Sequence, residues 1–270
     1  MPHACPTIFS QPTESGGTRD AGVCLNLYPT AYKLSYMVLE TEIIYTDSGL
    51  PRTRGGVLVE GLPGIGLVAK VAVAYVLKQL KVEKICRLIS PYFPSVGFIQ
   101  DDGRMIFNFA DLYYSKQPRE VILLYGNSQP ASSYGQYEFC EKVINLAKEM
   151  GVTTVLTIGG YGKESVSERR EIYCSSTDRE TLEEWMSKIG GVRYSGQIVG
   201  AAGLLAVLAK ENGMQNFSML VETADMTPDF YAARRAVEAL DKLLNLAIPI
   251  PTADELSRTY LTATQELETF

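Results

Sequence analysis

The sequence predicts an α/β fold, Rossmann-like or phosphorylase-like, with a mostly parallel central sheet, helices on both faces and an added antiparallel hairpin. Two observations predict it. Short apolar segments alternate with helical segments after residue 37, and several of the strands run directly into glycine-rich turns. Strands separated by helices need crossover connections, which give a largely parallel sheet covered on both faces.

The elements of the first half follow from their apolar patterns. Apolar, β-prone segments predict strands at 38–45, 56–60, 85–89 and 121–125. Apolar residues at helical spacing predict a helix over 64–80, and a second helix over 137–150 is closed by Gly151 at a position that favours a left-handed backbone. Asp101-Asp102-Gly103, flanked by 96–100 and 105–109, predicts a hairpin with 112–114 in a following loop.

The second half continues the alternation. The predicted strands are 154–158, 171–174 and 217–222. A capping box, Thr177 with Glu180, opens a helix to 188, and an apolar helix covers 203–211. Thr227 is predicted to cap a helix that runs to about residue 246 with Pro228 at its first position, and Thr252 with Glu255 is a second capping box.

These patterns divide the chain into three parts: residues 1–36, residues 37–250 and residues 251–270. The first is rich in proline and glycine and lacks the apolar run of a signal peptide, so we expect a mobile N-terminal extension. Met37 opens the first patterned segment, and translation starting there is an alternative. The second part is one α/β domain, and the third is a C-terminal helix or tail.

Composition excludes several kinds of partner. The formal net charge is −6 and the basic residues are scattered, so neither nucleic acid nor an anionic membrane surface is an expected partner. No apolar run is long enough to span a membrane. The five cysteines form no CxxC pair, which favours reduced thiols in a cytoplasmic protein.

The domain lacks residues that common catalytic sites need. The single histidine is His3, in the N-terminal extension, so a Ser-His or Cys-His pair inside the domain is excluded. A histidine-bearing zinc site is excluded there for the same reason. We therefore expect no catalytic residue, no metal and no cofactor, and the sequence leans against an enzyme.

Three glycine-rich turns are the candidate binding elements. The candidates are Gly61, Pro63, Gly64 and Gly66 in the first turn, Gly159, Gly160, Tyr161, Gly162 and Lys163 in the second, and Gly200 and Gly203 in the third. The first turn, in GxxGxG order, is either a tight steric turn or a site for a phosphate or nucleotide. The second leaves a strand end where ligands sit in open sheets, and Lys163 is either solvated or placed to meet an anion. For the third, close packing of a helix is the default interpretation.

Two carboxylates and four aromatic residues complete the candidates. Glu60 and Glu222 end apolar strands. If these strands are neighbours the two acids would share a crevice and bind a cation or exchange protons; otherwise they accept hydrogen bonds from loop amides. Tyr92, Phe93, Tyr113 and Tyr114 follow strands in predicted loops, where they anchor an interface or cover the edge of the sheet.

Four segments together resemble the proteasome assembly chaperone 2 family. They are 61–69, 157–161, 200–205 with Leu220-Val221-Glu222-Thr223, and Pro228-Asp229-x-x-Ala232-Ala233. The resemblance implies an α/β fold, self-association and proteasome subunits, namely the 20S α-ring, as partners. Some members are thought to dock through a C-terminal hydrophobic-Tyr-any tail, whereas Thr269 is the penultimate residue here and Tyr260 lies too far inside. Relatives have also been labelled ATP-grasp enzymes.

These observations lead to one expected function and two alternatives. We expect a cytoplasmic, non-enzymatic, homo-oligomeric protein that binds proteasome subunits. The first alternative is an enzyme or sensor, such as an ATP-grasp-like ligase, that binds a nucleotide or anion in the glycine-rich crevice. The second is a homo-oligomeric scaffold for another client.

Overall fold

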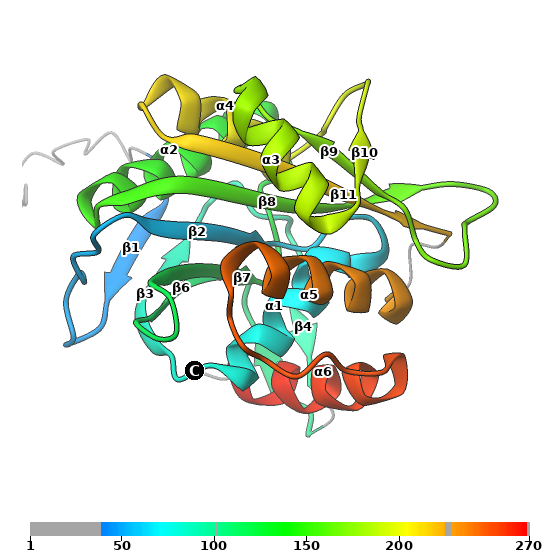
Figure 1. The fold of residues 1–270 in the computed structure, drawn as a ribbon. Coiled ribbons are helices and arrows are strands. Elements are labelled where there is room, and N and C mark those ends of the chain that lie inside the picture. The colour runs from blue at the N-terminus through cyan, green and yellow to red at the C-terminus, as the bar shows by residue number, and fades with distance from the viewer. Residues whose placement is uncertain (1–38, 101, 225–227, 269–270) are drawn as a thin grey trace, which may run out of the picture. The chain divides into compact units, whose positions relative to one another are not determined.

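Four parallel strands form the centre of the sheet. In spatial order they are β7 (Val121–Gly126), β2 (Gly56–Gly61), β8 (Val152–Gly162) and β11 (Gln215–Thr223). A computed structural model describes residues 39–100, 102–224 and 228–268. Apart from the ends of β8 and β11, these strands are buried on both faces because helices cover both sides (Figure 1). The predicted α/β class is confirmed.

Antiparallel strands extend the sheet at both edges. Beyond β7 lie β6 (Ala110–Ser115), β3 (Glu83–Ile89) and β1 (Glu42–Tyr45). Beyond β11 lie β9 (Ile172–Ser175), antiparallel to β11, and β10 (Val192–Arg193), parallel to β9. The parallel character is thus confined mainly to the centre, where the strand ends form the crevice described below.

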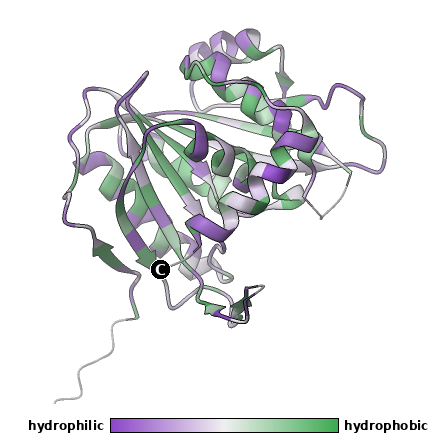
Figure 2. Ribbon diagram, turned by 90° about the horizontal axis from the view of Figure 1, so that it is seen from below, coloured by the Kyte–Doolittle hydropathy of each residue, from purple (hydrophilic) through white to green (hydrophobic). Residues whose placement is uncertain are grey.

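The helices divide between the two faces of the sheet. On one face lie α1 (Val68–Gln79), α3 (Arg179–Ile189), α5 (Phe230–Leu244) and α6 (Ala253–Leu267). On the other lie α2 (Ser133–Glu149) and α4 (Ala201–Glu211) (Figure 1). Each face has its own buried core, and Figure 2 shows that the strands between the two cores are largely hydrophobic. None of the helices in the described part of the chain has the length and apolar character needed to cross a bilayer.

Several predicted helix ends are confirmed and several helix starts are corrected. Gly151 has φ +77°, and Thr252 and Glu255 form the predicted capping box of α6. The first correction is at α3, where Asp178 rather than Thr177 caps the helix by accepting from the amide of Thr181. The second is at α2, which begins at Ser133, before the predicted start at residue 137.

The α5 helix also starts later than predicted. Asp229 is its cap, so Pro228 precedes the helix rather than opening it. The carboxylate of Asp229 accepts a hydrogen bond from the amide of Ala232 over 2.9 Å. The predictions for residues 1–36 and for Thr227 lie outside the described residues.

The predicted hairpin is present and stands apart from the main sheet. It consists of β4 (Phe98–Ile99) and β5 (Met105–Ile106), which pair only with each other among the described strands. In Figure 2 its short strands are green, separate from the larger sheet. The expected loop at 112–114 is wrong, because these residues belong to β6 and pair with β3 and β7.

Candidate functional site

The three glycine turns meet around one cavity at the carboxyl ends of the central strands. Its volume is about 560 Å³. The turn after β2 contributes Gly64 and Ile65, and the turn after β8 contributes residues 159–162. The chain leaves β2 toward α1 and leaves β7 toward α2 on the opposite face, so the cavity lies where the connections diverge. Such a switch point is where open α/β sheets bind ligands.

The first turn is shaped mainly by steric needs. A β-carbon on Gly61 would lie 2.5 Å from Val73 Cβ in α1, so glycine lets the helix approach the strand. Gly66 has φ +65°, and its carbonyl oxygen accepts the amide hydrogen of Asp229 over 2.9 Å. Gly61 and Gly66 therefore hold α1 and α5 in place, whereas Gly64 faces the cavity.

The second turn packs directly against the first. A β-carbon on Gly160 would collide with the carbonyl oxygen of Ile65, and one on Gly159 would lie 2.7 Å from Leu220 Cδ2. Backbone contact between the two turns thus requires glycine at position 160. Tyr161 follows on the face covered by α2 and α4, and its ring lines the cavity.

The third turn, before α4, is locked by a glutamine. Gly200 has φ +86°, and the amide of Ala201 donates to Gln129 Oε1 over 3.1 Å. Gln129 Nε2 in turn donates to the carbonyl oxygen of Pro63 over 2.6 Å, which ties the third turn to the first. Gly203 does not line the cavity; a β-carbon there would collide with the Ile198 carbonyl oxygen, which supports the packing interpretation.

Glu60 is the acidic group of the cavity. Its side chain is 2 % exposed and accepts hydrogen bonds from the amides of Leu62, over 2.7 Å, and Ile158, over 3.3 Å. Burial raises the pKa of Glu60 to about 7, and these two amides offset only part of the burial effect. The expected bonding of a strand-end carboxylate to loop amides is therefore found here.

Glu222 does not share the cavity with Glu60, because β8 lies between their strands. Lys163 Nζ lies 2.6 Å from Glu222 Oε1, and Ser167 donates its amide to Glu222 Oε2 over 2.8 Å. Burial alone would raise the pKa of Glu222, but the bonds from Lys163 and Ser167 outweigh it and lower the pKa to about 2. The possibility of a shared two-carboxylate crevice is thus corrected, and Lys163 is not among the residues that line the cavity.

Several cavity residues were missed from the sequence, among them three with polar side chains. Gln129 and Tyr194 come from connecting segments and Gln136 comes from the first turn of α2, and no motif marks them. The ring centroid of Tyr194 lies 5.7 Å from that of Tyr161, which packs on Tyr173 at 4.8 Å. The signal available was the concentration of tyrosines at 161, 173 and 194, but nothing local shows that these three rings meet.

The four predicted interface aromatics differ in exposure. Phe93 and Tyr113 are buried in the described chain, whereas Tyr92 and Tyr114 are half-buried. The hydroxyl of Tyr92 donates to the carbonyl oxygen of Leu39 over 2.7 Å. None of the four lines the cavity.

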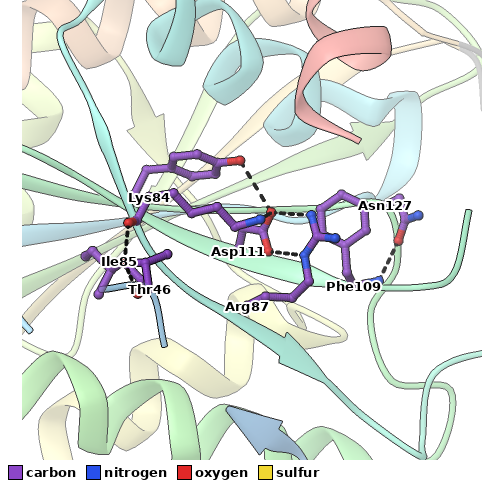
Figure 3. A network of polar contacts seen from close by, with 8 residues as sticks. Thr46, Lys84, Ile85, Arg87, Phe109, Asp111 and Asn127 are labelled. Atoms are coloured by element: carbon purple, nitrogen blue, oxygen red, sulfur yellow. Dashed lines mark hydrogen bonds and ion pairs between the residues drawn. The ribbon is translucent and has the colours of Figure 1, made fainter. Parts of the chain in front are cut away.

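A buried ionic cluster lies on β3 and β6, away from the cavity (Figure 3). Asp111 is fully buried, and its two carboxylate oxygens accept from Arg87 Nε over 2.7 Å and from Arg87 Nη2 over 2.8 Å. Lys84 Nζ lies 2.7 Å from Asp111 Oδ2. The guanidinium of Arg87 lies 4.1 Å from the ring centroid of Phe109. The cluster therefore combines ion pairs with a cation–π contact.

The described cysteines are buried, and the described thiols and acids form no metal-binding group. Among residues 39–100, 102–224 and 228–268, no group of three or more His, Cys, Asp or Glu side chains is arranged to hold a metal ion. Cys86, Cys140 and Cys174 are free and buried. Burial raises the pKa of Cys86 and of Cys174 to about 12, which leaves these thiols protonated and unreactive.

Comparison with known sequences identifies the family. A profile of the PAC2 family matches residues 58–268, which spans the cavity and both helical layers. The chain belongs to the PAC2 family. The PAC2 chain is also 33% identical over 196 residues to the uncharacterized protein MJ1210 of Methanocaldococcus jannaschii, covering 72% of this chain and 76% of that protein.

Solved structures show the same PAC2 fold. The crystal structure of Pyrococcus furiosus PbaB, described as an archaeal proteasome activator, has a TM-score of 0.74 and 30% identity, covering 86% of this chain and 100% of that chain. P. furiosus PbaA, described as an archaeal homolog of proteasome-assembly chaperone, has a TM-score of 0.67 and 23% identity, covering 84% and 90%. The structural neighbours of this PAC2 protein thus include a proteasome activator and a homolog of proteasome-assembly chaperone.

Proposed function

We propose that this PAC2 protein is a cytoplasmic, non-enzymatic proteasome assembly chaperone-like protein that self-associates and binds proteasome subunits, with the 20S α-ring as its docking site. The observation that carries the proposal is the similarity to PbaB, which has 30% identity and extends over the whole of that chain. PbaB is described as a proteasome activator, so a proteasome subunit is the partner that this similarity favours.

The chemistry of the cavity supports a non-catalytic role. The described residues that line it include Glu60, glutamines and tyrosines, but no serine, cysteine, lysine or histidine. A nucleophile with its base within hydrogen-bond reach is therefore not assembled there. The buried thiol of Cys140, whose pKa burial raises further than that of Cys86, is a core group of α2 rather than a nucleophile.

The β4–β5 hairpin offers a surface for self-association. Ile99 and Met105 are each 63 % exposed and Phe107 is 66 % exposed, an arrangement typical of an interaction site. An isolated two-stranded ribbon is marginally stable in water. Because β4 and β5 pair only with each other among the described strands, the hairpin of a second copy could pair along an open edge and bury these side chains.

Size-exclusion chromatography with light scattering tests self-association. The double variant Ile99→Ser/Phe107→Ser should shift the protein toward a smaller species while its circular dichroism spectrum stays unchanged. Leu261→Ser is the matched control, because Leu261 is 63 % exposed but lies on α6. An equal effect of both changes, or no change of size in the double variant, would argue against the hairpin as the contact surface.

A pull-down with purified 20S α-subunits tests the partner. We expect the full chain to retain α-subunits at micromolar concentration, as a stable but exchangeable complex would. Retained self-association without α-subunit binding would instead support a scaffold for another client. Failure of both assays would reject the proposal.

The anion-binding alternative receives less support from the geometry. Lys163, the basic residue nearest the second turn, is paired with Glu222, and no lysine or arginine is among the described residues that line the cavity. A phosphate would meet the Glu60 side chain instead of a cation. A ligase acting on ATP is therefore not the function that these residues favour.

A further inference from the structure

The β1 strand is an open edge of the main sheet. It pairs with β3 on one side, and no strand in the described part of the chain lies on its other side (Figure 1). The opposite edge strand, β10, is two residues long and carries Arg193, which pairs with Glu183. Short length and charge protect an edge from further pairing, whereas β1 contains neither lysine nor proline.

The backbone groups at the outer side of β1 follow from its pairing with β3. Thr46, directly after the strand, donates its amide to the carbonyl oxygen of Ile85 over 2.9 Å, so Thr46 faces β3. In an antiparallel pair, residues that bond to the neighbouring strand alternate with residues that do not. Ile44 therefore also faces β3, whereas Ile43 and Tyr45 direct their amides and carbonyls away from the sheet.

The free part of this edge is short and has defined ends. Thr41 precedes it, and the amide of Thr41 donates to Glu138 Oε1 over 2.7 Å, so this outward amide is already occupied. At the other end, the strand stops at Tyr45 and a turn follows at residues 47–48. Ile43 and Tyr45 are thus the two residues of β1 whose backbone can accept another strand.

The side chains of β1 are suited to strand pairing. Ile44 is 45 % exposed and Tyr45 is 49 % exposed, while Ile43 is half-buried against the core below α2 and α4. β-Branched and aromatic residues stabilise a sheet mainly through contacts with residues directly across on the next strand. A further strand would therefore both bond to this edge and cover its exposed apolar side chains.

We propose that β1 pairs antiparallel with β1 of a second copy around a twofold axis at Ile44, which makes one continuous sheet from two chains. Ile43 of each copy then pairs with Tyr45 of the other, and each of these pairs exchanges two backbone hydrogen bonds. The two Ile44 side chains lie directly opposite each other at the closely spaced position, with Cα atoms about 4.5 Å apart. This inference rests on the self-association proposed above and assigns it a second surface, distinct from the hairpin.

Charge favours this register. Glu42 is the only charged residue of β1 and is exposed. With the axis at Ile44, each Glu42 lies opposite the uncharged Thr46 of the other copy. With the axis at Glu42, two carboxylates would face each other at the closest position, and like charges directly opposite destabilise a strand pair.

The backbone excludes the other nearby registers. With the axis at Ile43, the second copy would bond to the Thr41 amide, which Glu138 already occupies. With the axis at Tyr45, Ile43 would have to pair with a residue of the turn at 47–48. The axis at Ile44 is therefore the symmetric arrangement that uses both free residues of the edge.

A charge exchange at Ile44 tests the twofold pairing by size-exclusion chromatography with light scattering. Ile44→Lys places two ammonium groups opposite each other and should give a smaller species, as should Ile44→Glu. An equimolar mixture of the two variants should recover the larger species, because opposite charges then meet. Val207→Lys, at a position 50 % exposed on α4, is the matched control and should keep the wild-type size. An unchanged size of Ile44→Lys, or no recovery on mixing, would overturn the proposal.

Disulfide cross-linking tests the register. Ile44→Cys, in a chain that also carries Cys5→Ser and Cys24→Ser, should form a linked dimer on mild oxidation, because the expected Cα separation lies within the range of disulfides. The thiols of the described part of the chain are buried and do not compete. Glu42→Cys is the matched control on the same strand and should not cross-link. Equal cross-linking of the two variants would contradict the axis at Ile44.

The outcomes separate this pairing from the function proposed above. An assembly that loses size in Ile99→Ser/Phe107→Ser but not in Ile44→Lys would reject the β1 contact alone. A wild-type chain that is monomeric would reject self-association as a whole, while α-subunit binding is measured independently. Hydrogen exchange gives a further check, because amides of Ile43 and Tyr45 that are protected in a monomer would show that another segment covers the edge, which also overturns the proposal.

Discussion

Lys70 and Glu268 form a buried ion pair between α1 and the residue that follows α6. Lys70 Nζ lies 2.7 Å from Glu268 Oε1, and the two side chains are 9 % and 5 % exposed. The hydroxyl of Tyr125 in β7 donates to the same oxygen over 3.0 Å. The end of α6 is thereby fixed to the sheet as well as to α1.

Glu268→Gln should lower the free energy of unfolding by about 3 kcal/mol, because it leaves Lys70 buried without its counter-charge. Urea denaturation measures the loss. Glu266→Gln is the matched control on the same helix, since the Lys78–Glu266 pair is largely exposed, and it should cost less than about 1 kcal/mol. Equal losses of unfolding free energy in the two variants would show that burial does not determine how much the Lys70–Glu268 pair contributes to stability.

Asp111→Asn should destabilise the fold by about 3 to 5 kcal/mol, because it removes the carboxylate that Arg87 and Lys84 contact in a buried setting. The loss is measured by urea denaturation. Glu184→Gln, which removes an exposed pair with Lys188, should cost less than about 1 kcal/mol. A small effect of Asp111→Asn would mean that water reaches the cluster.

Gly160→Ala should destabilise the protein by about 1 to 3 kcal/mol, because its β-carbon would push against the carbonyl oxygen of Ile65. Gly64→Ala is the control in the adjoining turn. Its φ is −146°, and no atom lies within 4 Å of the added carbon, so its stability should stay near that of the wild type. Thermal melts of both variants check this contrast, and similar melting temperatures would refute it.

The titration of Glu60 should make the free energy of unfolding depend on pH. Burial raises the pKa of Glu60 from 4.5 to about 7, so between these values the folded state holds a proton that the unfolded state has released. The free energy of unfolding should therefore fall as pH rises through this window, by about 3 kcal/mol in total, and level off above about pH 7.

Comparison with Glu60→Gln isolates this effect. The thiol of Cys140 in α2, whose pKa the Glu60 charge raises further, is the titratable group that faces Glu60, and it stays protonated throughout the window. The difference in unfolding free energy between the two proteins, measured by urea denaturation at several pH values, should slope downward with rising pH. A flat or rising difference would contradict the burial of the acid.

Local signals in the sequence were sufficient for most elements. Gly151 and the Thr252–Glu255 capping box marked helix ends because their partners lie within one turn. The start of α2 was placed too late, because its first turn contains Gly135 and depends on a distant contact. In the fold Gly135 permits close contact with Tyr92, which lies far away in sequence.

Long-range partners explain what the sequence could not show. The β6 strand contains Asp111 between apolar residues and resembles a loop, yet Arg87 and Lys84 from β3 neutralise this aspartate inside the sheet. The glycine turns were found, but the cavity between them also depends on Gln129 and Gln136, which no motif marks. Likewise, strand order alone separates Glu60 from Glu222.

The turn after β2 contacts both the cavity and the start of α5. Ile65 forms part of the cavity wall, while the next residue, Gly66, accepts the amide of Asp229 at the start of α5. A spectroscopic label near Asp229 should therefore sense events in the cavity without standing in the way of an incoming molecule. Because the main chain of this turn connects the cavity wall to Asp229, the region around Asp229 is a suitable position for a label that reports on the cavity.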